Sequence, residues 1–128
     1  PMFKDTKAFS SFSVNDLGKA RQFYADVLNL QVNESEDWLE LIVAGGGRIV
    51  VYPKADHSGA TFTVLNFPVD DIEKAVEQLK KLGVKFESYD QPGLKTGDDN
   101  ICRGTEGPLI AWFKDPAGNI LSVLEAGG

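Results

Sequence analysis

An internal repeat limits the folds open to this chain more than any other feature of its sequence. The segment Phe12–Ala20 (FSVNDLGKA) matches the segment Phe67–Ala75 (FPVDDIEKA) at one constant offset, with Phe, Val, Asp, Lys and Ala in common. Such a repeat implies one structural unit used twice, because similar segments are expected to fold alike. The 128 residues are the length of one ordinary domain, so we expect the two copies to be its two halves.

Each copy begins with the pattern of a strand followed by a helix. In the first copy, Phe12 and Val14 alternate with Ser11 and Ser13, which is the period of a half-buried strand. The second copy repeats this alternation over 64–69, and Asn or Asp residues suited to a helix N-cap follow in both copies. Apolar residues then recur at helical spacing: Leu17, Ala20, Phe23, Tyr24 and Val27 in the first copy, and Ile72, Ala75, Val76 and Leu79 in the second.

Three extended segments are expected after each helix. They cover 30–32, 38–43 and 48–52 in the first copy, and 84–89, 109–113 and 120–124 in the second. Residues 90–108 form a polar, glycine-rich stretch that is long for a loop and is a candidate lid. The sequence therefore predicts an α+β fold of two βαβββ modules, about 7–56 and about 60–127, within a single domain of residues 1–128. The two sheets are expected to face each other around a central cleft, a common place for a ligand.

Charge and composition exclude several classes of partner. The net charge of −6 argues against binding to nucleic acid or to an anionic membrane surface, since both attract basic proteins. The single cysteine, Cys102, excludes an internal disulfide. No apolar run approaches the length of a membrane span, and no signal peptide is recognisable, so we expect a cytoplasmic protein.

Two further motifs carry a resemblance to a known family. The segment Val14–Leu17 (VNDL) is followed by Phe23-Tyr24 and Leu28, and the segment Phe113–Leu121 (FKDPAGNIL) closes the second copy. In this order the motifs resemble the vicinal oxygen chelate superfamily, which includes glyoxalase I, extradiol dioxygenases, fosfomycin-resistance enzymes and bleomycin-resistance proteins. The resemblance covers nearly the whole chain and implies the paired βαβββ fold and a homodimer.

The resemblance also implies a divalent metal held by His, Gln or Glu side chains, and this chain departs from that pattern. The four ligand positions fall on residues with no good donor: Phe9, Val64, Ser122, and Val50 or Val51. We therefore expect no metal cofactor. A substitute site would use Glu40, on a strand, and Glu125, near the last strand. The interpretation that we favour is that Glu40 faces solvent and Glu125 lies in the frayed C-terminal tail.

Candidate ligand-binding residues come from strand parity and from the resemblance. Ser11, Ser13, Asn66 and Ser122 are expected on the sheet faces opposite the helices, where they would hydrogen-bond a polar ligand. Aromatic and apolar walls are expected from Phe9, Tyr52, Val64, Trp38 and Trp112. The alternative is that the polar residues merely occupy an under-filled sheet face and that the aromatic residues are core.

Two reactive side chains have simpler explanations. His57, the only histidine, would be a general base if Asp56 oriented it, but its polar surroundings are typical of a solvated loop. Cys102 lies beside Arg103, which would lower the pKa of its thiol, but no histidine lies near it in sequence. No catalytic residue can be assigned from these patterns.

Three functions remain open. The first is binding of a small organic molecule in the cleft without a metal, as in the bleomycin-resistance proteins that the chain resembles. The second is a glyoxalase-like lyase or a dioxygenase with an atypical divalent-metal site. The third is a structural or regulatory module whose cleft is filled by side chains. The first predicts stabilisation by organic ligands but not by metals, the metal-dependent second predicts stabilisation by metals, and the third predicts neither.

Overall fold

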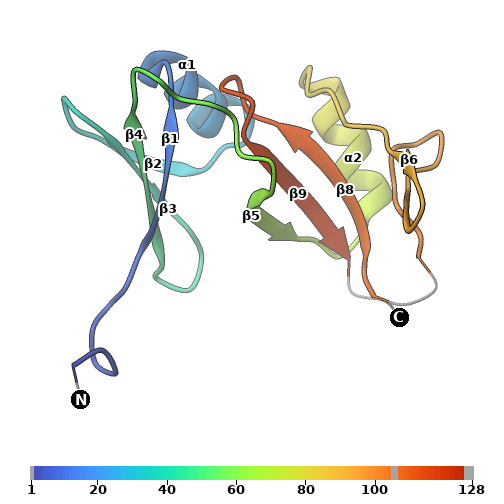
Figure 1. The fold of residues 1–128 in the computed structure, drawn as a ribbon, viewed down its shortest axis with the longest axis horizontal. Coiled ribbons are helices and arrows are strands. Elements are labelled where there is room, and N and C mark those ends of the chain that lie inside the picture. Colours follow the sequence, from blue (N-terminus) through green and yellow to red (C-terminus); the bar gives the residue numbers. More distant parts are fainter. Residues whose placement is uncertain (1, 105–106, 126–128) are drawn as a thin grey trace. The chain divides into compact units, whose positions relative to one another are not determined.

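The chain divides after Ser58 into two compact units, 1–58 and 59–128. The computed structural model describes residues 2–104 and 107–125 (Figure 1). The predicted module end at residue 127, and residues 105 and 106 of the predicted loop, lie outside the described residues. The predicted module boundaries stay a prediction, whereas the α+β fold is confirmed by the elements of both units.

The first unit is a four-stranded sheet with a helical segment. Its elements are β1 (Ser10–Val14), α1 (Leu17–Arg21), the π-helix η1 (Gln22–Val27), β2 (Gln31–Glu34), β3 (Leu39–Ile42) and β4 (Arg48–Pro53). The strand order is β1-β4-β3-β2, in which β1 and β4 are parallel and the other pairs are antiparallel (Figure 1). Glycines at positive φ, Gly45 and Gly46, form the turn between β3 and β4.

The helical segment begins as predicted but does not continue as a regular α-helix. Asp16 is the N-cap, and its Oδ1 accepts a hydrogen bond from the backbone N of Lys19 at 3.1 Å. After Arg21 the chain widens into a π-helix, in which Leu28 N donates to the carbonyl of Phe23, five residues earlier. The rings of Phe23 and Tyr24 pack edge to face along this wider turn. Apolar spacing alone could not reveal the change of hydrogen-bond pattern.

The second unit is a three-stranded sheet with one regular helix. Its elements are β5 (Thr63–Pro68), α2 (Ile72–Lys81), β6 (Asp90–Gln91), β7 (Leu94–Lys95), β8 (Leu109–Lys114) and β9 (Ile120–Glu125). The strand order is β5-β9-β8, with β5 and β9 parallel and β8 and β9 antiparallel (Figure 1). The helix α2 packs on β8 and β9 and buries an apolar core with them: Ile72, Val76, Ala111, Phe113, Leu121 and Val123.

Two carboxylates satisfy backbone donors at the start of α2. The N-cap residue Asp71 accepts a hydrogen bond from Lys74 N at 3.1 Å, and Glu125 accepts one from Ile72 N at 2.9 Å. The first turn of a helix has free N–H groups, so both contacts stabilise it. The expectation that Glu125 lies in a loose tail was wrong, because this residue ends β9 and caps a helix.

A buried polar turn joins β8 to β9. Asp115 Oδ1 accepts hydrogen bonds from the backbone N of Ala117 and of Asn119, both at 2.9 Å. The Asn119 side chain donates to Asp115 Oδ2 and accepts from Ala60 N at 3.2 Å. Asp115 and Asn119 are almost fully buried, so this network ties the segment that precedes β5 to the turn.

The segment before β8 is less regular than predicted. Residues 84–89 were expected to be a strand, but only one isolated bridge, between Phe86 and Phe113, forms there. The predicted long loop contains the short hairpin of β6 and β7. Beyond this hairpin, Cys102 exchanges two backbone hydrogen bonds with Ile110, so the described part of the loop is tied to the edge of β8. Across the described residues, no helix is long and apolar enough to cross a membrane.

Candidate functional site

The helix-free face of the four-stranded sheet carries the predicted site residues of the first unit. In β1, Phe12 and Val14 are buried, so Ser11 and Ser13 point to the opposite face. The register places Ser11 beside Val50 and Ser13 beside Tyr52. The structure therefore has both serines on the face that strand parity predicted, and Tyr52 lies next to Ser13.

A charged network crosses the same face from β1 to β2. Arg48 lies over the ring of Phe9, with its guanidinium carbon 4.1 Å from the ring centre, and its Nη1 is 2.7 Å from Oε2 of Glu40. The other oxygen of Glu40 accepts a hydrogen bond from the Asn33 side chain at 3.3 Å. The hydrogen bonds from Arg48 and then from Asn33 lower the pKa of Glu40. Glu40 is thus held in an ion pair on a polar sheet face.

A serine–histidine pair lies at the other end of β1. Oγ of Ser13 and Nδ1 of His57 are 2.6 Å apart and share a hydrogen bond, and both residues are half-buried. A hydroxyl and an imidazole can exchange donor and acceptor roles, so the pair offers either role to a ligand. The expectation of a solvated loop histidine missed this contact. Asp56, the carboxylate predicted to orient His57, is exposed and lies 3.8 Å from Lys54.

The helix-free face of the three-stranded sheet carries a row of three predicted residues. The register places Asn66, Ser122 and Trp112 side by side across β5, β9 and β8. Ser122 is fully buried, and its hydroxyl donates to Oδ1 of Asn66 at 2.5 Å. Val64 lies at the irregularity in β5 between Thr63 and Leu65, so the register does not assign it to a face.

An aromatic pair borders this row. Trp112 is half-buried, and Tyr89 meets its ring edge-on with the ring centres 5.4 Å apart. Burial, together with the nearby charge of Glu87, raises the pKa of Tyr89. Tyr89 was not singled out from the sequence. Its place beside Trp112 depends on the backbone contact between Glu87 N and the Trp112 carbonyl, which sequence patterns do not reveal.

Two other candidates lie outside the regular strands. Trp38, a predicted aromatic wall, precedes β3 and is 46% exposed. Cys102 is half-buried at the edge of β8, and the guanidinium of its neighbour Arg103 binds Asp99 and Glu73. The cation that would have activated the thiol is therefore engaged with two carboxylates.

The residues of these faces do not fit the divalent metal that the resemblance implies. Phe9 is covered by Arg48, and the Ser122 hydroxyl is directed to Asn66. The two carboxylates considered as substitute metal ligands already have other partners, since Glu40 binds Arg48 and Glu125 caps α2. Within residues 2–104 and 107–125, no group of three or more His, Cys, Asp and Glu side chains could hold a metal ion.

Solved structures of known proteins share this fold. The chain is similar to TnmS3, an antibiotic binding protein from a Streptomyces strain, with 20% identity, a TM-score of 0.68, and 96% of this chain and 98% of that chain covered. It is similar to the fosfomycin resistance protein FosX of Listeria monocytogenes, with 16% identity, a TM-score of 0.70, and coverage of 96% and 94%. It is also similar to a lactoylglutathione lyase of Agrobacterium tumefaciens, with 20% identity, a TM-score of 0.67, and coverage of 94% and 93%. At these identities the likeness shows the fold alone.

A family model supplies the assignment that structural likeness alone does not. No protein sequence with a curated description matches the chain. The model of one family, in contrast, matches residues 9–123, a span that includes both copies of the internal repeat and both terminal motifs. The chain therefore belongs to the Glyoxalase/Bleomycin resistance protein/Dioxygenase superfamily, as its motifs predicted.

Proposed function

We propose that this protein binds a small organic molecule through the helix-free faces of its sheets, without the divalent metal that enzymes of the superfamily use. One observation carries the proposal. These faces present hydrogen-bonding groups and aromatic rings, while the residues at the family's ligand positions supply no set of metal donors. Ligand sites are commonly built in this way, from apolar and aromatic surface with a few placed polar groups.

The polar groups suggest which ligands fit. Ser13 with His57 offers donors and acceptors, as does the exposed amide of Asn66, which the buried Ser122 hydroxyl orients. Arg48 offers a cation held by Glu40. Tyr52 and Trp112 offer aromatic surface. A partly aromatic molecule with hydroxyl, amide or carboxyl groups matches this set. The similarity to TnmS3, described as an antibiotic binding protein, supports a screen that begins with aromatic antibiotics.

The two tryptophans allow a direct test of the binding face. Trp38 and Trp112 are the only tryptophans, so Trp38→Phe leaves Trp112 as the single fluorescent reporter and Trp112→Phe leaves Trp38. Titration with aromatic antibiotics should change the fluorescence of the Trp38→Phe protein saturably and more strongly than that of the Trp112→Phe protein, because Trp112 lies within the row of β5, β9 and β8 whereas Trp38 precedes β3. An equal response of both variants to a binding compound would contradict the proposed face.

Thermal stability separates this proposal from its alternatives. A ligand at about 100 times its Kd raises the free energy of unfolding by about 2.7 kcal/mol, which raises Tm by several degrees. We expect such a shift with an organic ligand and none with Ni²⁺, Zn²⁺, Mn²⁺, Co²⁺ or anaerobic Fe²⁺ on chelator-treated protein. Saturable stabilisation by a metal would favour a lyase or a dioxygenase instead. A homodimer and a cytoplasmic location stay predictions, which sedimentation and cell fractionation would check.

A further inference from the structure

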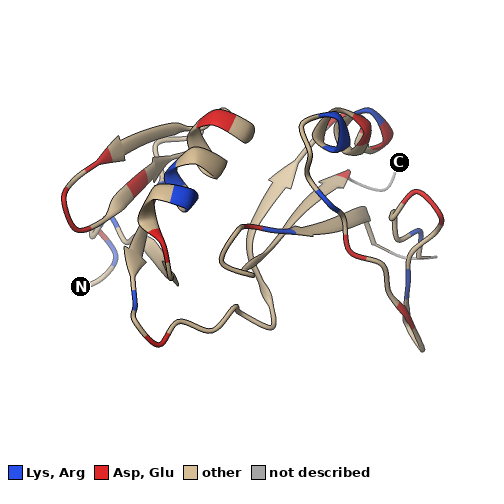
Figure 2. Ribbon diagram, turned by 90° about the horizontal axis from the view of Figure 1, so that it is seen from above, with Lys and Arg blue, Asp and Glu red and all other residues tan. Residues whose placement is uncertain are grey.

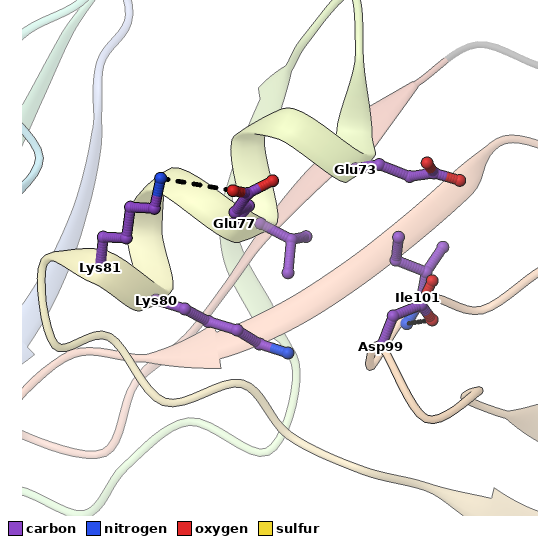
Figure 3. A pocket seen from close by; sticks show the side chains of 7 residues that line it. Glu73, Glu77, Lys80, Lys81, Asp99 and Ile101 are labelled. Atoms are coloured by element: carbon purple, nitrogen blue, oxygen red, sulfur yellow. Dashed lines mark hydrogen bonds and ion pairs between the residues drawn. The ribbon is translucent and has the colours of Figure 1, made fainter.

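A pocket of about 560 Å³ lies on the helix side of the second unit, away from the sheet face described above. Figure 3 shows it between α2 and the loop that carries Asp99 and Ile101. From α2 it takes Glu73, Val76 and Lys80, which share one side of the helix because they are three or four residues apart. Its volume falls within the range typical of small-molecule sites.

The pocket combines an apolar floor with charged walls. Val76 and Ile101 are buried and provide the floor. Beside this floor, the guanidinium of Arg103 forms ion pairs with two carboxylates. Its Nη2 is 2.6 Å from Oδ2 of Asp99 and 3.3 Å from Oε1 of Glu73. The hydrogen bond from Arg103 lowers the pKa of Asp99 to about 2, so this carboxylate stays ionised. With two negative charges against one positive charge, this end of the pocket keeps a net charge of −1.

The other end of the pocket is positive. Lys81 is paired with Glu77 at 3.3 Å, one turn away on α2. Lys80 has no ion-pair partner among the described residues, and Figure 3 shows its side chain extended toward the Asp99 side of the pocket. The pocket thus combines a lysine that has no ion-pair partner among the described residues, an excess negative charge around Arg103, and an apolar floor.

We propose that this pocket binds a small zwitterion, with the chemistry of a free α-amino acid that has an apolar side chain. The ligand carboxylate binds Lys80, the ammonium binds Glu73 and Asp99, and the side chain covers Val76 and Ile101. A ligand with a single charge leaves one end unmatched, so it binds more weakly. This inference is independent of the proposed function, because none of its residues lies on the helix-free sheet faces.

Nuclear magnetic resonance of the full ¹⁵N-labelled chain tests the proposal with L-leucine as the probe. We expect saturable amide shifts at Asp99, Ile101 and Val76 below about 10 mM leucine, which corresponds to a binding free energy of a few kcal/mol. N-acetyl-L-leucine lacks the ammonium, and L-leucinamide lacks the carboxylate. Each should bind about tenfold more weakly, as expected when one charge-assisted hydrogen bond is lost.

Two variants of α2 complete the test. Lys80→Gln should weaken leucine binding about tenfold, and Lys74→Gln, an exposed lysine of the same helix outside the pocket, should leave it unchanged. Both changes lie on exposed helix positions, so neither should prevent folding. The absence of saturable shifts with leucine would overturn the proposal. So would equal affinity of the Lys80→Gln and Lys74→Gln proteins, or equal affinity for leucine and its singly charged forms.

Discussion

Both sheets contain a parallel pair of first and last strands followed by an antiparallel pair, but their helix-free faces hold polar groups in opposite ways. In the first unit, Glu40 and Arg48 form an ion pair that is partly open to solvent. In the second unit, Ser122 is fully buried and bonds a neutral partner, Asn66. Figure 2 shows the same contrast along the chain, since β8 and β9 carry charged residues only at their ends whereas β3 carries one within the strand.

This difference separates polar groups that maintain the fold from polar groups that are available to a ligand. An exposed ion pair contributes little to stability, because water solvates its members when they separate. A buried group that loses its partner costs much more, since no water replaces the lost hydrogen bond. Polar substitutions should therefore destabilise the second unit more than the first, and the following predictions test this in order of expected effect.

The largest difference is expected between two asparagines. Asn119→Ala removes the acceptor of Ala60 N and a partner of Asp115 in a buried turn, and should lower the free energy of unfolding by about 2–4 kcal/mol. Asn33→Ala, which removes an exposed bond to Glu40, should cost less than about 0.5 kcal/mol. Urea unfolding measures both. Similar losses for the two variants would contradict the distinction between buried polar groups of the second unit and exposed polar groups of the first.

Two serines give a second matched pair. Ser122→Ala removes the donor to Asn66 from a fully buried position and should cost about 1 kcal/mol. Ser11→Ala changes an exposed residue of β1 and should stay within about 0.5 kcal/mol of the unmodified protein. Thermal unfolding at neutral pH resolves the two. A larger loss for Ser11→Ala would mean that the first face supports the fold more than its exposure suggests.

Two strand glutamates test the contribution of the helix cap. Glu125→Ala removes the acceptor of Ile72 N and should cost about 1 kcal/mol, as the loss of a cap does. Glu34→Ala breaks an ion pair with Arg21 in which both side chains are about half exposed, and should cost less than about 0.5 kcal/mol. Hydrogen exchange at the first turn of α2 should quicken only in the Glu125 variant. Unchanged exchange there would show that Asp71 caps the helix alone.

The smallest effect is expected in acid, where protonation of Asp99 and Glu40 breaks their ion pairs with arginine. The folded-state pKa of Asp99 is about 2, below its ordinary value of 3.8. Its contribution to stability is therefore present above pH 3.8 and is lost as the pH falls toward about 2. The Asp99→Asn protein should lose less stability than the unmodified protein over this interval. Glu40→Gln should act in the same direction, because the pKa of Glu40 is also lowered. Parallel pH profiles for all three proteins would contradict both assignments.

The sequence predicts those features of the fold that depend on residues close together in the chain, such as strand faces and helix caps. Strand parity placed Ser11 and Ser13 opposite the buried face of β1, and the aspartates that begin each helix act as N-caps. Regions with a clear period became regular elements, such as β8, β9 and α2. The segment 84–89 has a similar local pattern but forms only a bridge, because its neighbours along the edge of β8 decide its hydrogen bonding.

The contacts of the candidate sites depend on residues that are distant in the sequence. Ser13 meets His57 across 44 positions, and Arg103 joins Glu73 across 30. No spacing rule links such residues. The sequence therefore suggested a solvated loop for His57, and for Arg103 only an effect on the neighbouring thiol of Cys102. Whether the predicted ligand-binding residues act together stays a prediction for the fluorescence test.

The parallel pairing of first and last strands has a consequence for how the chain folds. Phe12 pairs with Val51 in the first unit, and Phe67 pairs with Val123 in the second. The second pairing encloses a longer loop, and its closure costs about 0.3 kcal/mol more in chain entropy. Contacts between distant positions also slow folding. We expect the first sheet to form early and the pairing of β5 with β9 to be the slower step, so that the edge of β9 that receives β5 stays uncovered for longer. The second unit is therefore the part of the protein that most needs protection from aggregation during folding.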